Sequence, residues 1–238
     1  MKKTIFWILT TSGILVCGFV LVAYGRTWNK TELEIRLHIN EKLVLESTFG
    51  EPPTFAIWIG EPGSDRAQTV FVTGRAGRGD WEGKAAVPVA LPRWFEVNEK
   101  EKQAAQQPGT HVPDEMAISG ATPTPGYFTT RVRVMPGKKL TCWMEVNLAG
   151  DFNASFPEFD VKNQTSDEYK TGQPALLYKA ELQAEMGTEA TPVIAGMAVL
   201  DSSGRVHILP PDGITTAKDI FDEITLRIIK PKHRIIDW

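Results

Sequence analysis

The chain has little cysteine, histidine and net charge, and each shortage excludes a class of protein. Its two cysteines are Cys17 and Cys142, and Cys17 lies inside an apolar run, so no disulfide is expected to staple the folded part. The four histidines, at positions 38, 111, 207 and 233, share no spacing typical of a metal site or of covalent haem. The formal net charge is -3, whereas a nucleic-acid-binding protein requires a basic stripe on its surface. We therefore expect neither a disulfide scaffold, nor a metal or haem protein, nor a nucleic-acid partner.

Recognisable catalytic constellations are lacking as well. No serine lies in a nucleophile elbow, and the glycine-rich stretch 74–81 has neither the spacing of a P-loop nor the context of a dinucleotide site. The carboxylates of Glu158, Asp160, Asp167 and Glu168 do not alternate as calcium ligands do in an EF-hand loop, so a solvated acidic face is the better interpretation. We predict a protein that is not an enzyme and holds no metal, with a surface hairpin at 74–81.

One long apolar run is present, near the N-terminus. Residues 5–24 carry no charge, follow Lys2 and Lys3, and precede Arg26. A helix of that length rises about 30 Å, the thickness of the hydrocarbon core of a bilayer. Residues 1–25 are therefore predicted to be a transmembrane anchor, with the two lysines in the cytoplasm and the rest of the chain outside it. The alternative is a signal peptide cleaved before Arg26, although the run is longer than most signal-peptide cores.

Beyond this run, short segments with a period of two predict a mainly β protein. In Thr31–Ile39 every second side chain is apolar and the others are polar, as in a half-buried strand. Pro- and Gly-rich turns separate the segments, and many short strands with such turns are typical of a β-sandwich. Further strands are predicted at Leu43–Thr48, Phe55–Ile59, Gln68–Thr73, Phe128–Val134, Leu140–Leu148, Ala175–Leu182, Val193–Leu200, Val206–Leu209 and Ile224–Ile229.

Two segments have helical character. Trp94–Gln107 consists largely of good helix formers and ends before Pro108-Gly109, and Thr216–Glu223 is predicted to form one or two turns capped by Thr216. Gln107–Gly126, rich in Pro, Gly and Thr, is predicted to be an ordered loop between two halves of the sandwich. Residues 26–183 are assigned to the sandwich, and residues 184–238 either form a small separate β unit or add strands to it.

Some buried positions are also predicted. Cys142 lies in a strand-like run and is expected to be a small buried hydrophobic residue. Trp58 and Trp143, at strand positions, are expected in the core. With Trp81 and Trp94 they also leave open a weaker alternative, stacking faces of a periplasmic hydrolase or carbohydrate-binding module.

Several short motifs resemble one bacterial family. They are Phe55-Ala56-Ile57-Trp58-Ile59, Ala67–Phe71, Leu91-Pro92-Arg93-Trp94, Ser119–Gly126, Trp143–Asn147 and Gly172–Tyr178. These motifs look like those of predicted periplasmic proteins of unknown function, often encoded beside flavin transferases and PepSY-type membrane proteins. The resemblance spans residues 33–183 and implies an immunoglobulin-like β-sandwich outside the cytoplasm, without a known activity.

The string Ser119-Gly120-Ala121-Thr122 also resembles the site at which flavin transferases attach FMN to a threonine through a phosphoester. By that resemblance Thr122 is the acceptor, and the small Gly-Ala pair before it lets the modifying enzyme approach. The match is incomplete, because Met116 stands where such sites usually have Asp, and Pro123 stiffens the segment. A plain turn that leads into the next strand is the alternative.

Two surface segments are predicted to contact partners. Arg75, Arg78 and Trp81 suit a docking tip, since Arg and Trp are favoured at interfaces. The apolar ending Ile235, Ile236 and Trp238 is expected to dock on its own domain or on a partner.

Together these observations predict a single-pass inner-membrane protein with a periplasmic sandwich. It would serve as an accessory subunit of a larger membrane complex, and the genes that accompany the resembled family favour an electron-transfer complex. A flavinylated electron carrier, with FMN on Thr122, is the alternative.

Overall fold

The structure, a computed structural model, describes residues 30–64, 66–78, 89–105, 118–120, 123–167 and 170–231. Its helical elements are α2 (Glu41–Glu46), α3 (Gly74–Arg78), α4 (Pro92–Ala105) and the 3-10 turn η1 (Thr216–Lys218). The strands are β1 (Thr31–Ile39), β2 (Thr54–Gly60), β3 (Ala67–Thr73), β4 (Ile118–Gly120), β5 (Gly126–Val134), β6 (Lys139–Asn147), β7 (Phe159–Asp160), β8 (Thr165–Ser166), β9 (Ala175–Gln183), β10 (Glu189–Ala190), β11 (Val193–Leu200), β12 (Val206–Leu209) and β13 (Phe221–Ile229).

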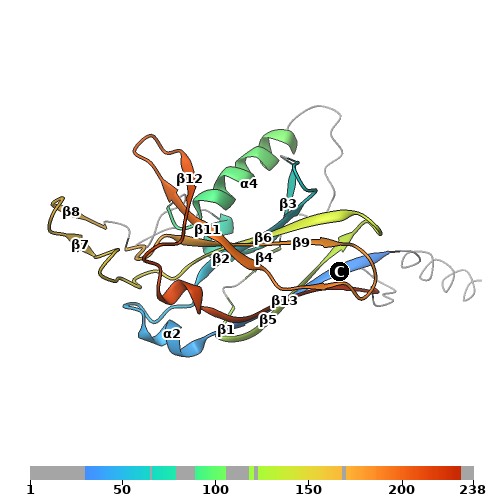
Figure 1. The fold of residues 1–238 in the computed structure, drawn as a ribbon, viewed down its shortest axis with the longest axis horizontal. Helices are drawn as coiled ribbons and strands as arrows, with labels where there is room; N and C mark the ends of the chain where they lie inside the picture. Colours follow the sequence, from blue (N-terminus) through green and yellow to red (C-terminus); the bar gives the residue numbers. More distant parts are fainter. Residues whose placement is uncertain are drawn as a thin grey trace, which may run out of the picture.

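Two sheets are stacked face to face, and α4 covers the outer side of the larger one (Figure 1). The small sheet has the order β10-β13-β1-β5, and the large sheet has the order β12-β11-β9-β6-β2-β3-β4. Within both sheets the paired strands run antiparallel, apart from the short parallel contact of β3 with β4. The predicted mainly β, sandwich-like fold with few helices is confirmed.

Strand β1 shows how alternating apolar and polar residues give the small sheet one buried face. Leu33, Ile35 and Leu37 are fully buried, while the residues between them are half-buried or exposed. The strand lies between β13 and β5, with Leu33 opposite Ile228 on one side and Val132 on the other. A period of two thus gives the small sheet one apolar face, which packs on the large sheet.

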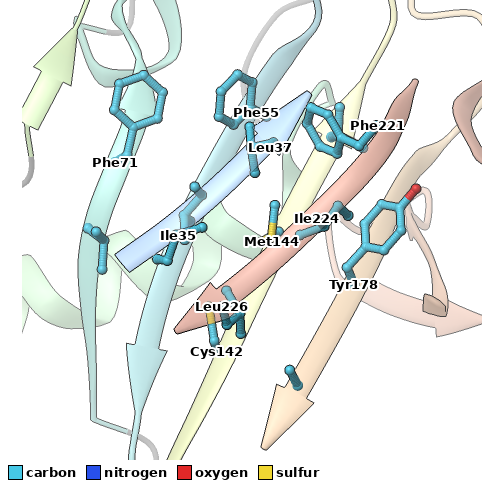
Figure 2. Close-up of a cluster of buried hydrophobic side chains, with 14 of the residues drawn as sticks. Ile35, Leu37, Phe55, Phe71, Cys142, Met144, Tyr178, Phe221, Ile224 and Leu226 are labelled. Carbon is cyan, nitrogen blue, oxygen red and sulfur yellow. The ribbon is translucent and has the colours of Figure 1, made fainter. Parts of the chain in front are cut away.

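The main core fills the space between the sheets. Figure 2 shows side chains from both sheets meeting there, including Phe55 of β2, Met144 of β6 and Tyr178 of β9 opposite Phe221 of β13. The ring of Phe55 lies 5.5 Å from that of Phe221, centroid to centroid, at a near-perpendicular angle typical of aromatic pairs. Cys142 is buried among these residues as a free thiol, as predicted.

A second apolar cluster lies on the other face of the large sheet. Trp94 and Val97 of α4 pack there on Ala56, Trp58 and other strand residues. The large sheet is therefore covered on both faces, which explains its nearly continuous apolar strands such as Phe55–Ile59. The helix predicted at 94–107 is present, but it begins two residues earlier, at Pro92.

The strand predicted at Leu43–Thr48 is wrong, because this segment forms α2. Asn40 caps the helix, with its side-chain oxygen accepting a hydrogen bond from the Leu43 N–H at 3.4 Å. Lys42 and Glu46 then form an ion pair one turn apart. An apolar run of three residues fits either structure, and here the cap selects the helix.

The hairpin predicted at 74–81 is also wrong in the part that the structure describes. Residues 74–78 continue from β3 into the short helix α3, and Ala76 of this helix is buried in the second cluster. Glycine content alone favoured a turn, whereas packing of Ala76 against the outer face of the sheet stabilises a helical turn.

Two other segments depart from their predictions. Only Thr216–Lys218 is helical in the stretch 216–223, because β13 already begins at Phe221, and Thr216 does not cap this turn. Within the loop predicted at 107–126, residues 118–120 form the edge strand β4.

The C-terminal stretch contributes to both sheets. Of its described strands, β10 and β13 lie in the small sheet, and β11 and β12 lie in the large one. The predicted anchor, residues 1–25, lies outside the described residues. From residue 30 onward, in the parts described, no helix is long and apolar enough to cross a bilayer.

Candidate docking surface at the loop end

Two ends of the sandwich can be distinguished by strand β1. The base is the end where β1 begins, and the loop end is the opposite end, where β1 leads into α2 (Figure 1). At the loop end the chain forms the segments 40–53, 148–174 and 210–220, which connect strands of both sheets. These connections include the buried polar side chains of Asp151 and Gln173.

The carboxylate of Asp151 joins two of these connections. It is buried and accepts hydrogen bonds from the Gln173 N–H and from the Thr216 hydroxyl, both at 2.8 Å. Burial raises the pKa of Asp151 to about 7, although these hydrogen bonds favour its charged form. Asp151 therefore couples the segment after β6 to the turn η1 before β13.

The side chain of Gln173 completes this link with both ends of its amide. Its oxygen accepts a hydrogen bond from the Thr215 N–H at 2.6 Å, and its nitrogen donates to the Asp151 carbonyl at 2.8 Å and to the Thr216 hydroxyl. The preceding residue, Gly172, has a φ of +73°, and an added Cβ would lie 2.3 Å from an Asp151 carboxylate oxygen. Only glycine therefore fits at position 172, directly before Gln173.

Asn147 and Asn153 extend the network to the neighbouring backbone. The Asn147 amide donates to the carbonyls of Thr171 and Gln173, and its buried oxygen has no hydrogen-bond partner among the described residues. The Asn153 oxygen accepts from two backbone N–H groups of its own turn, and its nitrogen donates to the Gly213 carbonyl at 2.9 Å. Segments 148–174 and 210–220 are thus fixed to each other by side chains. Segment 40–53 is joined to them by the Thr48 hydroxyl, which donates to the Gly150 carbonyl at 2.8 Å.

The chemistry of this network is structural. Its members are carboxylate, amide and threonine hydroxyl groups whose hydrogen bonds are directed at each other and at the backbone. In the described ranges, no three His, Cys, Asp or Glu side chains come together as metal ligands. The hydrogen bonds of this arrangement hold the loops together.

The acidic residues predicted as a solvated face serve mainly to shape the hairpin of β7 and β8. Asp160 accepts hydrogen bonds from the N–H groups of Lys162 and Asn163 in the turn, and these bonds lower its pKa. Glu158 pairs with Lys170, and Asp167 accepts from the Thr171 hydroxyl. Glu168 lies outside the described residues.

Exposed apolar side chains lie on these fixed loops. The loop-end apolar side chains, which are 37% to 72% exposed, are Leu45, Phe49, Phe159 and Val161. Leu45 belongs to α2, and Phe159 and Val161 belong to the hairpin of β7 and β8, which Figure 1 shows at the same end of the molecule. Aromatic side chains such as Phe49 and Phe159 are enriched at protein interfaces, and Leu45 and Val161 add apolar area beside them.

A second buried carboxylate holds α4 on the outer face of the large sheet. Glu145 of β6 is fully buried and accepts hydrogen bonds from the N–H groups of Arg93, at 3.0 Å, and Trp94, at 2.6 Å, in the first turn of the helix. Burial raises its pKa to about 8. Because the carboxylate is inaccessible, its role is to cap and place the helix.

The far part of α4 is fastened by a second polar contact. Glu101 accepts hydrogen bonds from the N–H and the hydroxyl of Thr69 in β3, at 3.0 and 2.8 Å. The same hydroxyl accepts from the indole N–H of Trp94 at 3.3 Å. The helix is thus held at both its first and its third turn.

The site residues predicted from the sequence remain a prediction, because none of their side chains belongs to the described residues. Arg75 and Arg78 belong to α3, but their side chains are outside the described set. The other predicted positions, namely Trp81, Thr122, Ile235, Ile236 and Trp238, lie outside the described residues.

Sequence reasoning missed both buried carboxylates and the loop network. One signal for Glu145 was available, because it is the only charged residue in Leu140–Leu148. For Asp151 and Gln173 no local pattern exists, since their partners at 215 and 216 are far along the chain.

The chain was compared with models of protein families, with curated proteins and with solved structures, and none of them matches.

Proposed function

We propose that this chain is a membrane-anchored, periplasmic accessory subunit that docks through its loop end on a larger membrane complex. The single observation that carries the proposal is that exposed apolar side chains lie on loops which a buried polar network holds fixed. Fixed loops lose little conformational freedom on binding, so the free energy of their contacts is retained as affinity. An immunoglobulin-like arrangement of the sandwich, with recognition at its loops, is part of this proposal.

The position of the predicted anchor relative to β1 supports this role. The apolar run 5–24 precedes β1, so an anchor there holds the base of the sandwich near the bilayer. Strand β1 has nine residues and spans about 30 Å. The loop end therefore extends away from the membrane surface, where it meets the extramembrane part of a neighbouring subunit.

Co-purification in mild detergent tests the proposal. Full-length protein should elute from native membranes with the same membrane subunits in repeated preparations. Leu45→Asp with Val161→Asp should reduce their recovery at least tenfold, because a charge in an apolar interface disfavours association. Val193→Asp, a control at a position 67% exposed and paired with the middle of β9, away from the loops, should not change recovery. Elution of the chain alone, or equal recovery with both variants, would contradict the proposal.

A flavinylated electron carrier is the second candidate function. Ser119 and Gly120 form part of β4, which lies at the edge of the large sheet and, among the described strands, pairs with β3 alone. A motif that leaves an edge strand is accessible to a modifying enzyme from the unpaired side. This candidate predicts yellow protein and a mass increase of one FMN unit, lost in Thr122→Val and retained in Thr124→Val. An unmodified mass for protein made with its flavin transferase would rule it out.

A further inference from the structure

Two adjacent turns at the base each present an exposed methionine. Met135 is 71% exposed in the turn between β5 and β6, and Met186 is 56% exposed in the turn after β9. The backbone joins the two turns, because Gly137 N–H donates to the Ala184 carbonyl at 2.9 Å and Ala184 N–H donates to the Lys138 carbonyl at 2.8 Å. The two methionines are therefore carried by one hydrogen-bonded unit.

This unit lies beside the point where the chain enters the sandwich. Thr31, the first residue of β1, pairs with Val134, and its hydroxyl donates to the Val134 carbonyl at 2.9 Å. Met135 is the next residue along. On the other side, Gly187 N–H donates to the carbonyl of Ile228, which pairs with Leu33 near the start of β1. Both turns thus flank the first residues of β1.

The length of chain before β1 limits the distance between the base and the apolar run 5–24. The run ends at residue 24, so the Cα atoms of residues 24 and 31 are at most about 25 Å apart. If residues 5–24 span the bilayer, the base cannot move far from the lipid surface. This tether argues for lipid, rather than another protein, as what the methionines meet.

The side chains around the turns suit a membrane interface. Methionine is apolar and flexible, so it adapts to the irregular boundary between headgroups and acyl chains. Lys138 extends from the same turn, where its ammonium pairs with Glu61 at 3.3 Å on the exposed surface, and Lys230 follows directly after β13. Lysine can lay its apolar stem along the interface and keep its ammonium among phosphate groups.

From this geometry we infer that the base of the sandwich rests on the bilayer, with Met135 and Met186 inserted at the level of the headgroups. The inference rests on the proposed anchor and adds a second membrane contact, made by the folded domain itself. That contact fixes the orientation of the sandwich, so the loop end faces away from the membrane.

Site-specific quenching in vesicles tests this contact. The full chain with Cys17→Ser is reconstituted into phosphatidylethanolamine–phosphatidylglycerol vesicles, with one cysteine introduced as Met135→Cys, Met186→Cys, Leu45→Cys or Val161→Cys. The remaining Cys142 should stay unlabelled, because it is buried and burial raises the pKa of its thiol to about 12. Each cysteine carries a polarity-sensitive fluorophore, and a fraction of the lipid carries a nitroxide high on its acyl chain.

Labels at 135 and 186 should be quenched several-fold more than labels at 45 and 161, with emission shifted to the blue. Equal quenching at the two ends, in protein that floats with the vesicles, would overturn the inference and leave the anchor intact. Failure of the chain to float with the vesicles would overturn the anchor, and the inference with it.

Discussion

The two faces of the large sheet are both buried, but they are held in different ways. The inner face contributes mostly apolar side chains, such as Phe55, Ile57 and Met144, to the contact with the small sheet. The outer face combines an apolar cluster with hydrogen bonds that Glu145 and Thr69 accept from Trp94 of α4. Apolar contact is strong but non-directional, whereas hydrogen bonds fix position and orientation. The inner face thus supplies stability, and the outer face places one helix.

The comparison predicts that the largest loss of stability follows a cavity in the inner face. Phe55→Ala removes a fully buried ring that lies 5.2 to 5.6 Å from the rings of Phe71, Phe128 and Phe221. We expect the free energy of unfolding to fall by about 3–5 kcal/mol. Denaturant unfolding measures this change.

Phe159→Ala, at a half-exposed ring of the loop end, is the matched control. We expect it to change the free energy of unfolding by less than about 0.5 kcal/mol. Similar losses for the two variants would show that the inner face is not the main source of stability.

A smaller and more local loss is predicted on the outer face. Glu145→Ala leaves the N–H groups of Arg93 and Trp94 without their acceptor, at a cost of about 1–3 kcal/mol. Amide hydrogen exchange should accelerate in α4 while β1 and β13 keep their protection. Glu99→Ala, whose side chain is exposed on the same helix and pairs with Lys102, should leave exchange nearly unchanged. Uniformly faster amide exchange across both sheets would contradict the prediction that Glu145 acts locally, on α4 alone.

Taken over one pH unit, the smallest predicted effect is a pH dependence of the stability that comes from the outer face. The pKa of Glu145 is about 8 in the folded chain, above its ordinary value of 4.5, so the folded state holds a proton that the unfolded state releases. Stability is therefore lost as the pH rises from 4.5 to 8, by at most about 1.4 kcal/mol per pH unit.

Glu145→Gln should remove this contribution. Asp151, whose pKa of about 7 acts in the same direction over an overlapping range, is unchanged in the variant. The difference between the two unfolding profiles therefore isolates Glu145. Parallel profiles of the parent chain and Glu145→Gln across this range would refute the assignment.

Regular alternation and long apolar runs made most strands predictable. The segment Thr31–Ile39 and both strands of the hairpin β11–β12 have the predicted bounds, because period-two patterns and flanking turns specify them locally. The sequence predicted a strand in place of α2 and a hairpin in place of α3. Each helix is short, and α2 depends on the cap at Asn40 whereas α3 depends on the burial of Ala76. Such contacts outweigh weak local preferences.

The candidate docking surface was less predictable than the fold. The predicted tip at 75–81 rested on residue type, whereas Leu45, Phe159 and Val161 have nothing unusual in their sequence and are notable only for their exposure. The hydrogen-bond network of the loop end joins residues 147–153 to residues 171–173 and 213–216. Hydrogen bonds between such distant segments leave no periodic signal, so only the tertiary structure reveals them.

The position of β1 between β5 and β13 has a consequence for how the protein is made. Leu33 lies opposite Ile228, so β1 gains β13 as its second neighbour only when the chain has been synthesised beyond residue 229. Until then one edge of β1 stays open, and pairing across such a long stretch of chain is slow. The newly made polypeptide is therefore prone to aggregation during this interval, and a truncation before residue 221 should be cleared by proteases instead of accumulating.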